Sequence, residues 1–322
     1  MPSLHSLLLK GAALLVALTT VAAAQDYPTK PVRMIIPFPP GGSNDVVGRM
    51  IATQLSEKLG KQVVVDNRAG AGGTIGTELA ANSAPDGYTL VIISIAHAVN
   101  PHLYKLNYDP LKSFVPVGVL ASGPNVLAIN PSLPVNSVKE LIALAKQKPG
   151  DIQWASAGIG SFQHLGGTLF ALEAGIDILH VPFKGGGPAM IDVIGGHTKL
   201  MFSSLVQTTP HIKSGKLKAL GVGSKTRSTV LPDVPTVAEA GLPSYEAVNW
   251  WGVFAPAGTP PAIVEKLHKA LTAVQDSPDV QQQFDREGAS VVRMSSAEFG
   301  KFVESETNKW GRVVREGKIK AE

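Results

Sequence analysis

Short apolar runs alternate with segments of helical spacing along most of the chain, and this alternation constrains the fold more than any other feature. From Val32 onward, strands are predicted over 32–38, 63–65 and 89–95, with helices over 44–59 and 77–83 between them. A strand-helix-strand-helix-strand order favours a parallel sheet that is covered by helices.

The rest of the chain continues the same pattern. Further strands are predicted over 125–130, 152–157, 178–181, 199–204, 218–224 and 250–255, and helices over 137–148, 163–174, 261–275, 278–287 and 296–316. The 322 residues are about right for two domains. We therefore predict an α/β fold of two lobes, each a sheet flanked by helices, with a cleft and a hinge between them.

Two short crossings between the lobes are predicted, near Ser122-Gly123-Pro124 and near 243–248. They divide the chain into a discontinuous first lobe, 25–124 plus 249–322, and a second lobe, 125–248. Two crossings favour a hinge.

The first 24 residues are predicted to be a secretory signal peptide. Lys10 precedes the apolar stretch 11–21, and Ala22-Ala23-Ala24 forms a cleavage site. An uncleaved anchor is the alternative, because leucines already precede Lys10. We expect the mature protein to be exported to the periplasm.

Composition excludes several classes of function. The chain has no Cys, so thiolate chemistry and Cys-ligated metals are excluded. The net charge of +4 comes from scattered basic residues, so no nucleic-acid partner is expected. Motifs for phosphate loops, nucleophile elbows and zinc proteases are missing, the Gly-rich run 70–76 does not match the dinucleotide fingerprint, and His97 and His102 are a poor metal pair. We predict no cofactor, no metal and no enzymatic activity.

Loops that follow predicted strands are the candidate binding elements, since ligands of parallel α/β sheets bind at the carboxyl ends of strands. In the first such loop, 38–45, glycines allow close backbone approach, and the N–H groups that begin the next helix attract an anion. An ordinary Gly-rich turn is the competing interpretation.

Three further loops and one strand complete this set. The loop 156–164 offers the hydroxyls of Ser156 and Ser161, while the loop 94–100 turns the backbone of Ala96 and His97 toward the same cleft. In the third loop, 181–188, Lys184 would supply a counter-charge to an anion, or it would simply be a solvated lysine. At the end of the loop 156–164, His164 would bind the ligand or only pack at the start of a helix. Trp250 and Trp251 are neighbours in a predicted strand, so their rings lie on opposite faces of it. One of the rings would stack on a flat ligand in the cleft, or both would fill the core.

An ordered set of segments resembles the Bug family, the periplasmic receptors of tripartite tricarboxylate transporters. The segments are 36–45 (IPFPPGGSND), 65–73 (VDNRAGAGG), 84–90 (APDGYTL), 180–185 (HVPFKG), 231–236 (LPDVPT) and 254–260 (FAPAGTP). The resemblance covers essentially the whole mature chain. It implies a receptor that closes on its ligand like a flytrap and passes it to membrane permease subunits.

The resemblance also implies which residues hold a ligand carboxylate, mainly through backbone groups. Carried over by motif, these are Gly41, Gly42, Ser43, Ser156, Gly158, Ile159, Gly160 and Ser161. The chain departs from the family pattern at Asn44, where Thr or Ser is usual, and at Phe183, where Tyr is frequent. Both departures remove a hydroxyl.

The resulting prediction is a periplasmic solute-binding receptor, monomeric, for a small carboxylate. An aromatic acid or diacid such as terephthalate and a di- or tricarboxylate are the ligand alternatives. A ligand-presenting sensor for a two-component system and an exported α/β hydrolase are the alternative functions. The full candidate set is Phe38, Gly41, Gly42, Ser43, Ala96, His97, Ser156, Gly158, Ile159, Gly160, Ser161, His164, Phe183, Lys184, Ser204 and Trp250.

Overall fold

The computed structural model describes residues 27–286 and 288–321, so the predicted signal peptide lies outside the described residues. The strands are β1 (Val32–Ile36), β2 (Val63–Asn67), β3 (Thr89–Ser94), β4 (Phe114–Ile129), β5 (Gln153–Ser156), β6 (Leu179–Pro182), β7 (Leu200–Ser204), β8 (Lys218–Val222), β9 (Val248–Pro256) and β10 (Ser290–Val291). The helices are α2 (Ser43–Leu59), α3 (Thr74–Ala81), α4 (Ile95–Val99), α5 (Val138–Gln147), α6 (Phe162–Ala174), α7 (Gly186–Gly195), α8 (Leu205–Lys213), α9 (Pro261–Gln275), α10 (Pro278–Arg286) and α11 (Ser296–Glu316), with short 3₁₀ turns at Ala71–Gly73 and Asn100–His102.

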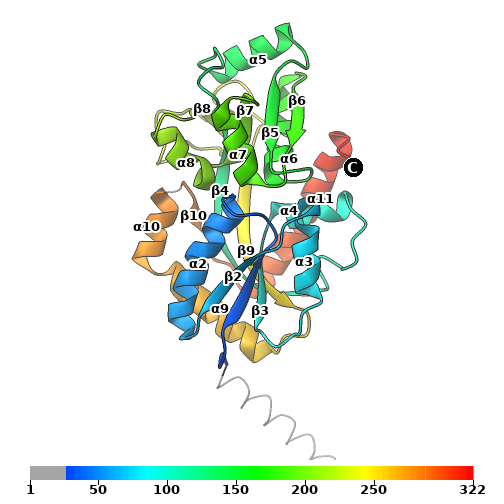
Figure 1. Ribbon diagram of the computed structural model, residues 1–322, viewed down its shortest axis with the longest axis vertical. Coiled ribbons are helices and arrows are strands. Elements are labelled where there is room, and N and C mark those ends of the chain that lie inside the picture. Colours follow the sequence, from blue (N-terminus) through cyan, green and yellow to red (C-terminus); the bar gives the residue numbers. More distant parts are fainter. Residues whose placement is uncertain (1–26, 287, 322) are drawn as a thin grey trace, which may run out of the picture.

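The first lobe is built on the sheet order β2-β1-β3-β9-β4 (Figure 1). β1 pairs in parallel with β2 and β3, while β9 runs antiparallel to β3 and β4. Alternate residues of β1 face opposite sides. Met34 joins a core with α2 and α9, and Ile35 joins a second core with α11.

The second lobe has β7, β5 and β6 as its parallel strands, and β4 pairs antiparallel with β7 and β8 (Figure 1). One face of this sheet packs against α5 and α6, and the other against α7. Both lobes are thus α/β layers, and the two-lobe fold class predicted from the alternation is confirmed.

The long strand β4 runs through both lobes. Its residues from Phe114 to Pro124 pair with β9, whereas those from Asn125 to Ile129 pair with β7 and β8. The segment Ser122-Gly123-Pro124, near which a short crossing between the lobes is predicted, is therefore part of this continuous strand. Gly123 and Pro124 give the signature of a turn, yet they pair in regular register with Asn249 and Val248 of β9. The two register shifts between the strands lie earlier, between Pro116 and Gly118 and between Val119 and Ala121.

The helix α11 also contacts both lobes. Phe299 and Val303 pack in the core of the first lobe, while Trp310 and Val314 join the cluster that contains Phe170 of the second. The chain therefore ends beside α6 (Figure 1). The assignment of 249–322 to the first lobe stays a prediction.

Candidate functional site

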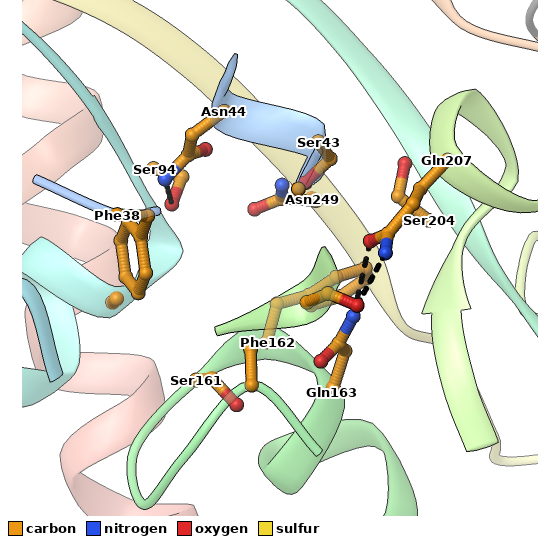
Figure 2. Close-up of a pocket in the computed structure, with 14 residues that line it drawn as sticks. Phe38, Ser43, Asn44, Ser94, Ser161, Phe162, Gln163, Ser204, Gln207 and Asn249 are labelled. Carbon is orange, nitrogen blue, oxygen red and sulfur yellow. Dashed lines mark hydrogen bonds between the residues drawn. The ribbon is translucent and has the colours of Figure 1, made fainter. Parts of the chain in front are cut away.

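A small pocket lies between the lobes, where loops from both converge (Figure 2). Its unfilled space is about 410 Å³, including the open mouth. The residues that line it come from both sides of the cleft: Phe38, Gly42, Ser43, Asn44, Ser94, Ala96 and Asn249, together with Ala157, Ser161, Phe162, Gln163, Gly186, Ser204 and Gln207. All of these side chains are neutral.

Three helices begin at this pocket without a side-chain cap. The N-cap residues are Gly42 for α2, Gly185 for α7 and Ser204 for α8, and none accepts a capping hydrogen bond through its side chain. The first N–H groups of a helix have no partner within the helix, and the helix dipole adds positive potential at that end. The pocket thus offers an anion backbone donors from both lobes.

Asp45 lies beneath the first of these helix starts, buried at 5% exposure. Burial alone would raise the pKa of its carboxyl, but hydrogen bonds from Arg49 and Asn67 and from the Gly41 N–H hold that pKa below its usual value. The carboxylate is therefore ionised and fully engaged with these donors. Its repulsion of a ligand anion is offset by the neighbouring guanidinium.

The loop 156–161 of the second lobe uses most of its polar groups internally. Ser161 caps α6 by accepting from the His164 N–H at 3.2 Å, and the Gly160 N–H donates to His164 Nδ1 at 3.1 Å. Ser156 Oγ contacts His180 Nε2 at 2.6 Å and accepts from the Gly158 N–H. These groups build the loop and leave Ser161 at the pocket wall.

The two histidines behind this loop stack on each other, with ring centroids 4.0 Å apart and planes within 3°. Burial lowers the pKa of His164 to about 3 and that of His180 to about 4, and in His164 the neighbouring His180 adds to the shift. Both rings are therefore neutral near pH 7. His164 packs against Trp154 and lies outside the pocket between the lobes.

Six of the predicted residues line the pocket: Phe38, Gly42, Ser43, Ala96, Ser161 and Ser204. Gly158, Phe183 and Lys184 line a neighbouring hollow that shares Phe38 and Ala157 with it. Gly41 donates to Asp45, and Ile159 accepts from Tyr104, so these two support the loops rather than line the pocket.

His97 and Trp250 do not line this pocket. Pro110 accepts a hydrogen bond from His97 Nε2 at 2.8 Å, so the ring points into the aromatic core behind Ala96. Trp250 Nε1 donates to Glu306 at 3.1 Å, and its ring packs against Phe299 and Phe302 of α11. Trp251 is fully buried as well, so both rings prove to be core residues.

Sequence reasoning missed five polar residues of the pocket and one glycine: Asn44 as a lining residue, Ser94, Gln163, Gln207 and Asn249, with Gly186. Gln163 and Gln207 lie in the first turns of α6 and α8. Extending the strand-end rule to every strand and one helical turn beyond would have found both. Asn249 lies inside β9, where no local signal marks it.

The model of the tripartite tricarboxylate transporter family receptor matches residues 47–319. The chain belongs to this receptor family. Among the family's relatives, it is 42% identical to Protein BugT of Bordetella pertussis over 297 residues, 91% of each chain.

Two solved structures of related proteins have the same fold as this chain. The periplasmic binding protein BugD is similar with a TM-score of 0.88 and 37% identity, over 92% of this chain and 100% of that one. The R. palustris protein Rpa4515, solved with adipate, is similar with a TM-score of 0.89 and 36% identity, over 92% and 99%. The chain is thus a solute-binding receptor of the periplasmic type. Within the described residues, none of the helices is long and apolar enough to cross a membrane.

Proposed function

We propose that the protein captures a small carboxylate between its two lobes in the periplasm and hands it to the membrane subunits of a tripartite transporter. One observation carries the proposal: α2, α7 and α8 begin uncapped at a pocket whose lining side chains are all neutral. A carboxylate that receives backbone N–H groups there gains about 1.5–3 kcal/mol per charge-assisted bond. The phenyl rings of Phe38 and Phe162 would contact the body of the ligand.

Closure follows from the way the chain crosses between the lobes. We assign the first lobe to 25–124 plus 249–322 and the second to 125–248, with β4 and β9 as the hinge strands. Because the pocket takes donors from both sides, a bound carboxylate stabilises the closed arrangement over the open one. The ligand-binding residues proposed from the first lobe are Gly42 and Ser43, and those from the second are Ser161, Gly186 and Ser204.

Localisation, partners and mechanism follow the same proposal. Residues 1–24 have the pattern of a signal peptide, and the receptor works as a monomer that meets its permease when closed. Binding rather than catalysis is its role. Rpa4515 was solved with adipate, which supports a carboxylate as the ligand class here.

Isothermal titration calorimetry of the mature protein tests this proposal. The panel pairs carboxylic acids with their uncharged primary amides, which have similar shape but no anionic group. We expect binding of at least one acid and none of its amide. If folded protein binds no acid, or binds acid and amide equally, the carboxylate proposal is wrong.

A further inference from the structure

A chain of amides in the second lobe has a fixed polarity (Figure 2). The Gly186 carbonyl accepts a hydrogen bond from Gln207 Nε2 at 2.6 Å, and a carbonyl can only accept. The amide nitrogen of Gln207 must therefore face Gly186. Its Oε1 atom is consequently directed toward Ser203 and Gln163.

The polarity of Gln207 determines that of Gln163. Gln163 Nε2 donates to Gln207 Oε1 at 3.3 Å and to Ser203 Oγ at 2.8 Å, while the Ser203 hydroxyl donates to Gln207 Oε1 at 3.1 Å. Turning the Gln163 amide over would bring two carbonyl oxygens together. The three side chains are buried, with exposures of 5% or less.

This arrangement leaves an amide oxygen of the second lobe's pocket lining unused, and Asn44 Oδ1 of the first lobe is likewise buried without a partner among the described residues. Gln163 Oε1 is buried and has no hydrogen-bond partner among the described residues, although the side chain lines the pocket. Ser204 also lines the pocket. Its buried Oγ has no hydrogen-bond partner within residues 27–286 and 288–321. A buried acceptor without a donor is costly, so the bound ligand should supply one.

The charges around the pocket limit which group the far end of the ligand can carry. A second carboxylate beside Gln163 Oε1 would meet a carbonyl oxygen instead of a cation, since no Lys, Arg or His lines the pocket. Lys184 belongs to the neighbouring hollow and is exposed, so water screens its charge. An ammonium group would likewise lack an acidic partner in the lining.

We infer that the ligand is a monocarboxylic acid whose far end carries a neutral hydrogen-bond donor, a hydroxyl or a primary amide, received by Gln163 Oε1. This inference rests on the proposed carboxylate function and adds the chemistry of the ligand's other end. Gln163 is then the specificity-determining residue, and Gln207 and Ser203 position it.

Two matched ligand series test the inference by calorimetry at neutral pH. The first contains hexanoate, the ω-hydroxy acid of equal chain length, and adipate; the second contains benzoate, para-hydroxybenzoate and terephthalate. In the series that fits the pocket, we expect the hydroxy acid to bind about tenfold tighter than the unsubstituted acid, and the diacid to bind more weakly than both. The diacid should gain affinity on acidification, when its far carboxyl becomes a donor.

The variant Gln163→Met assigns the effect to the residue. We expect it to lose the tenfold preference for the hydroxy acid over the unsubstituted acid, and this ratio within one variant is the readout, whatever the variant's absolute affinities. Circular dichroism and thermal unfolding establish that it is folded, and the wild-type series stands independently if it is not.

The outcomes separate this inference from the proposed function. If no acid binds, the carboxylate function fails. If acids bind but the hydroxy acid has no advantage, or the diacid binds equally well, or Gln163→Met keeps the preference, the donor inference alone is overturned.

Discussion

The first turn of α2 in the first lobe and the first turn of α6 in the second both begin at the cleft after a strand and a glycine-containing loop. They differ in how their first N–H groups are satisfied. Ser161 caps α6 through its side chain, whereas the N-cap of α2 is Gly42, which has no side chain to offer. The helix start that faces the cleft is therefore capped by a side chain in the second lobe and uncapped in the first.

This difference shows how the two lobes divide the work of binding. Glycine at an N-cap costs only about a few tenths of a kcal/mol relative to a capping side chain, so α2 forgoes little stability while its first N–H groups stay open to an anion. The second lobe keeps α6 capped and instead presents α7, α8 and the Gln163 amide. Ligand affinity should therefore respond to the backbone of α2, and folding stability to the cap of α6.

The substitution Ser43→Pro should produce the largest effect, because it removes a backbone N–H at the open helix start. Proline is tolerated at the first position of a helix, and Gly42, with φ −85° and ψ 166°, has the extended conformation that suits a residue before proline. We expect carboxylate affinity to fall by about tenfold to a hundredfold, the equivalent of one charge-assisted bond, with unchanged unfolding of the free protein.

The matched variant Ser43→Ala keeps the N–H and removes only the hydroxyl. Calorimetry should find it much closer to the wild type. Equal affinities for the two variants would show that the α2 backbone does not hold the anion.

The buried histidines behind the pocket provide a second comparison between the lobes, through the pH dependence of stability. His97 belongs to the first lobe, and His164 and His180 belong to the second. Burial lowers the pKa of His97 to about 4, against about 6.5 in the unfolded chain, so the unfolded state binds the proton more readily between these values. The stability contributed by the neutral ring is complete above the unfolded pKa and is lost as pH falls from there toward 4. At about pH 5 this amounts to about 2 kcal/mol of unfolding free energy.

Urea unfolding at about pH 7.5 and about pH 5 measures this loss. In His97→Gln, the amide nitrogen replaces Nε2 as the donor to Pro110 without titrating, so the variant should lose less stability on acidification. The remaining pH dependence includes that of His164 and His180 in the second lobe. An identical pH dependence of variant and wild type would contradict the neutral state of His97.

The contact between the two walls gives a smaller effect. A Cβ atom added at Gly187 of α7 would lie 2.6 Å from the Pro40 carbonyl oxygen of the other lobe. Gly187→Ala should hinder closure and weaken carboxylate binding by about tenfold, the order expected for mild overpacking. The free protein should unfold as before, since alanine suits a helix.

Gly195→Ala on the same helix is the control. There the nearest atoms belong to the exposed side chain of His197, at 3.2 Å, which can move. Small-angle scattering with saturating ligand should find Gly187→Ala more open than this control. If Gly187→Ala and Gly195→Ala bind equally well and scatter equally, the close approach of Gly187 to Pro40 does not limit closure.

Much of the fold was predictable from local signals. The helices α9 and α11 have the predicted bounds, because Pro261 at the first position of one and the Ser295–Glu298 capping box of the other mark their starts. The first part of β4 was missed since Pro116, Gly118, Gly123 and Pro124 interrupt its apolar pattern.

The site was predictable only where it follows strand ends. The loops around Gly42 and Ser161 were found in this way, whereas the amides of Gln163 and Gln207 act through contacts between distant segments. For Trp250 both a place beside the ligand and a place in the core stayed open, because alternation tells which face of β9 it occupies but not that α11 covers that face.

The smallest expected effect tests the side-chain cap of α6 directly. Ser161→Ala removes the side chain that accepts from the His164 N–H, so the free energy of unfolding should fall by about 1 kcal/mol. The same change at Ser43 removes a hydroxyl that caps no helix and should leave that free energy nearly unchanged. Urea unfolding of both variants without ligand measures the difference. Equal destabilisation by the two substitutions would show that the helix starts of α2 and α6 do not differ as described.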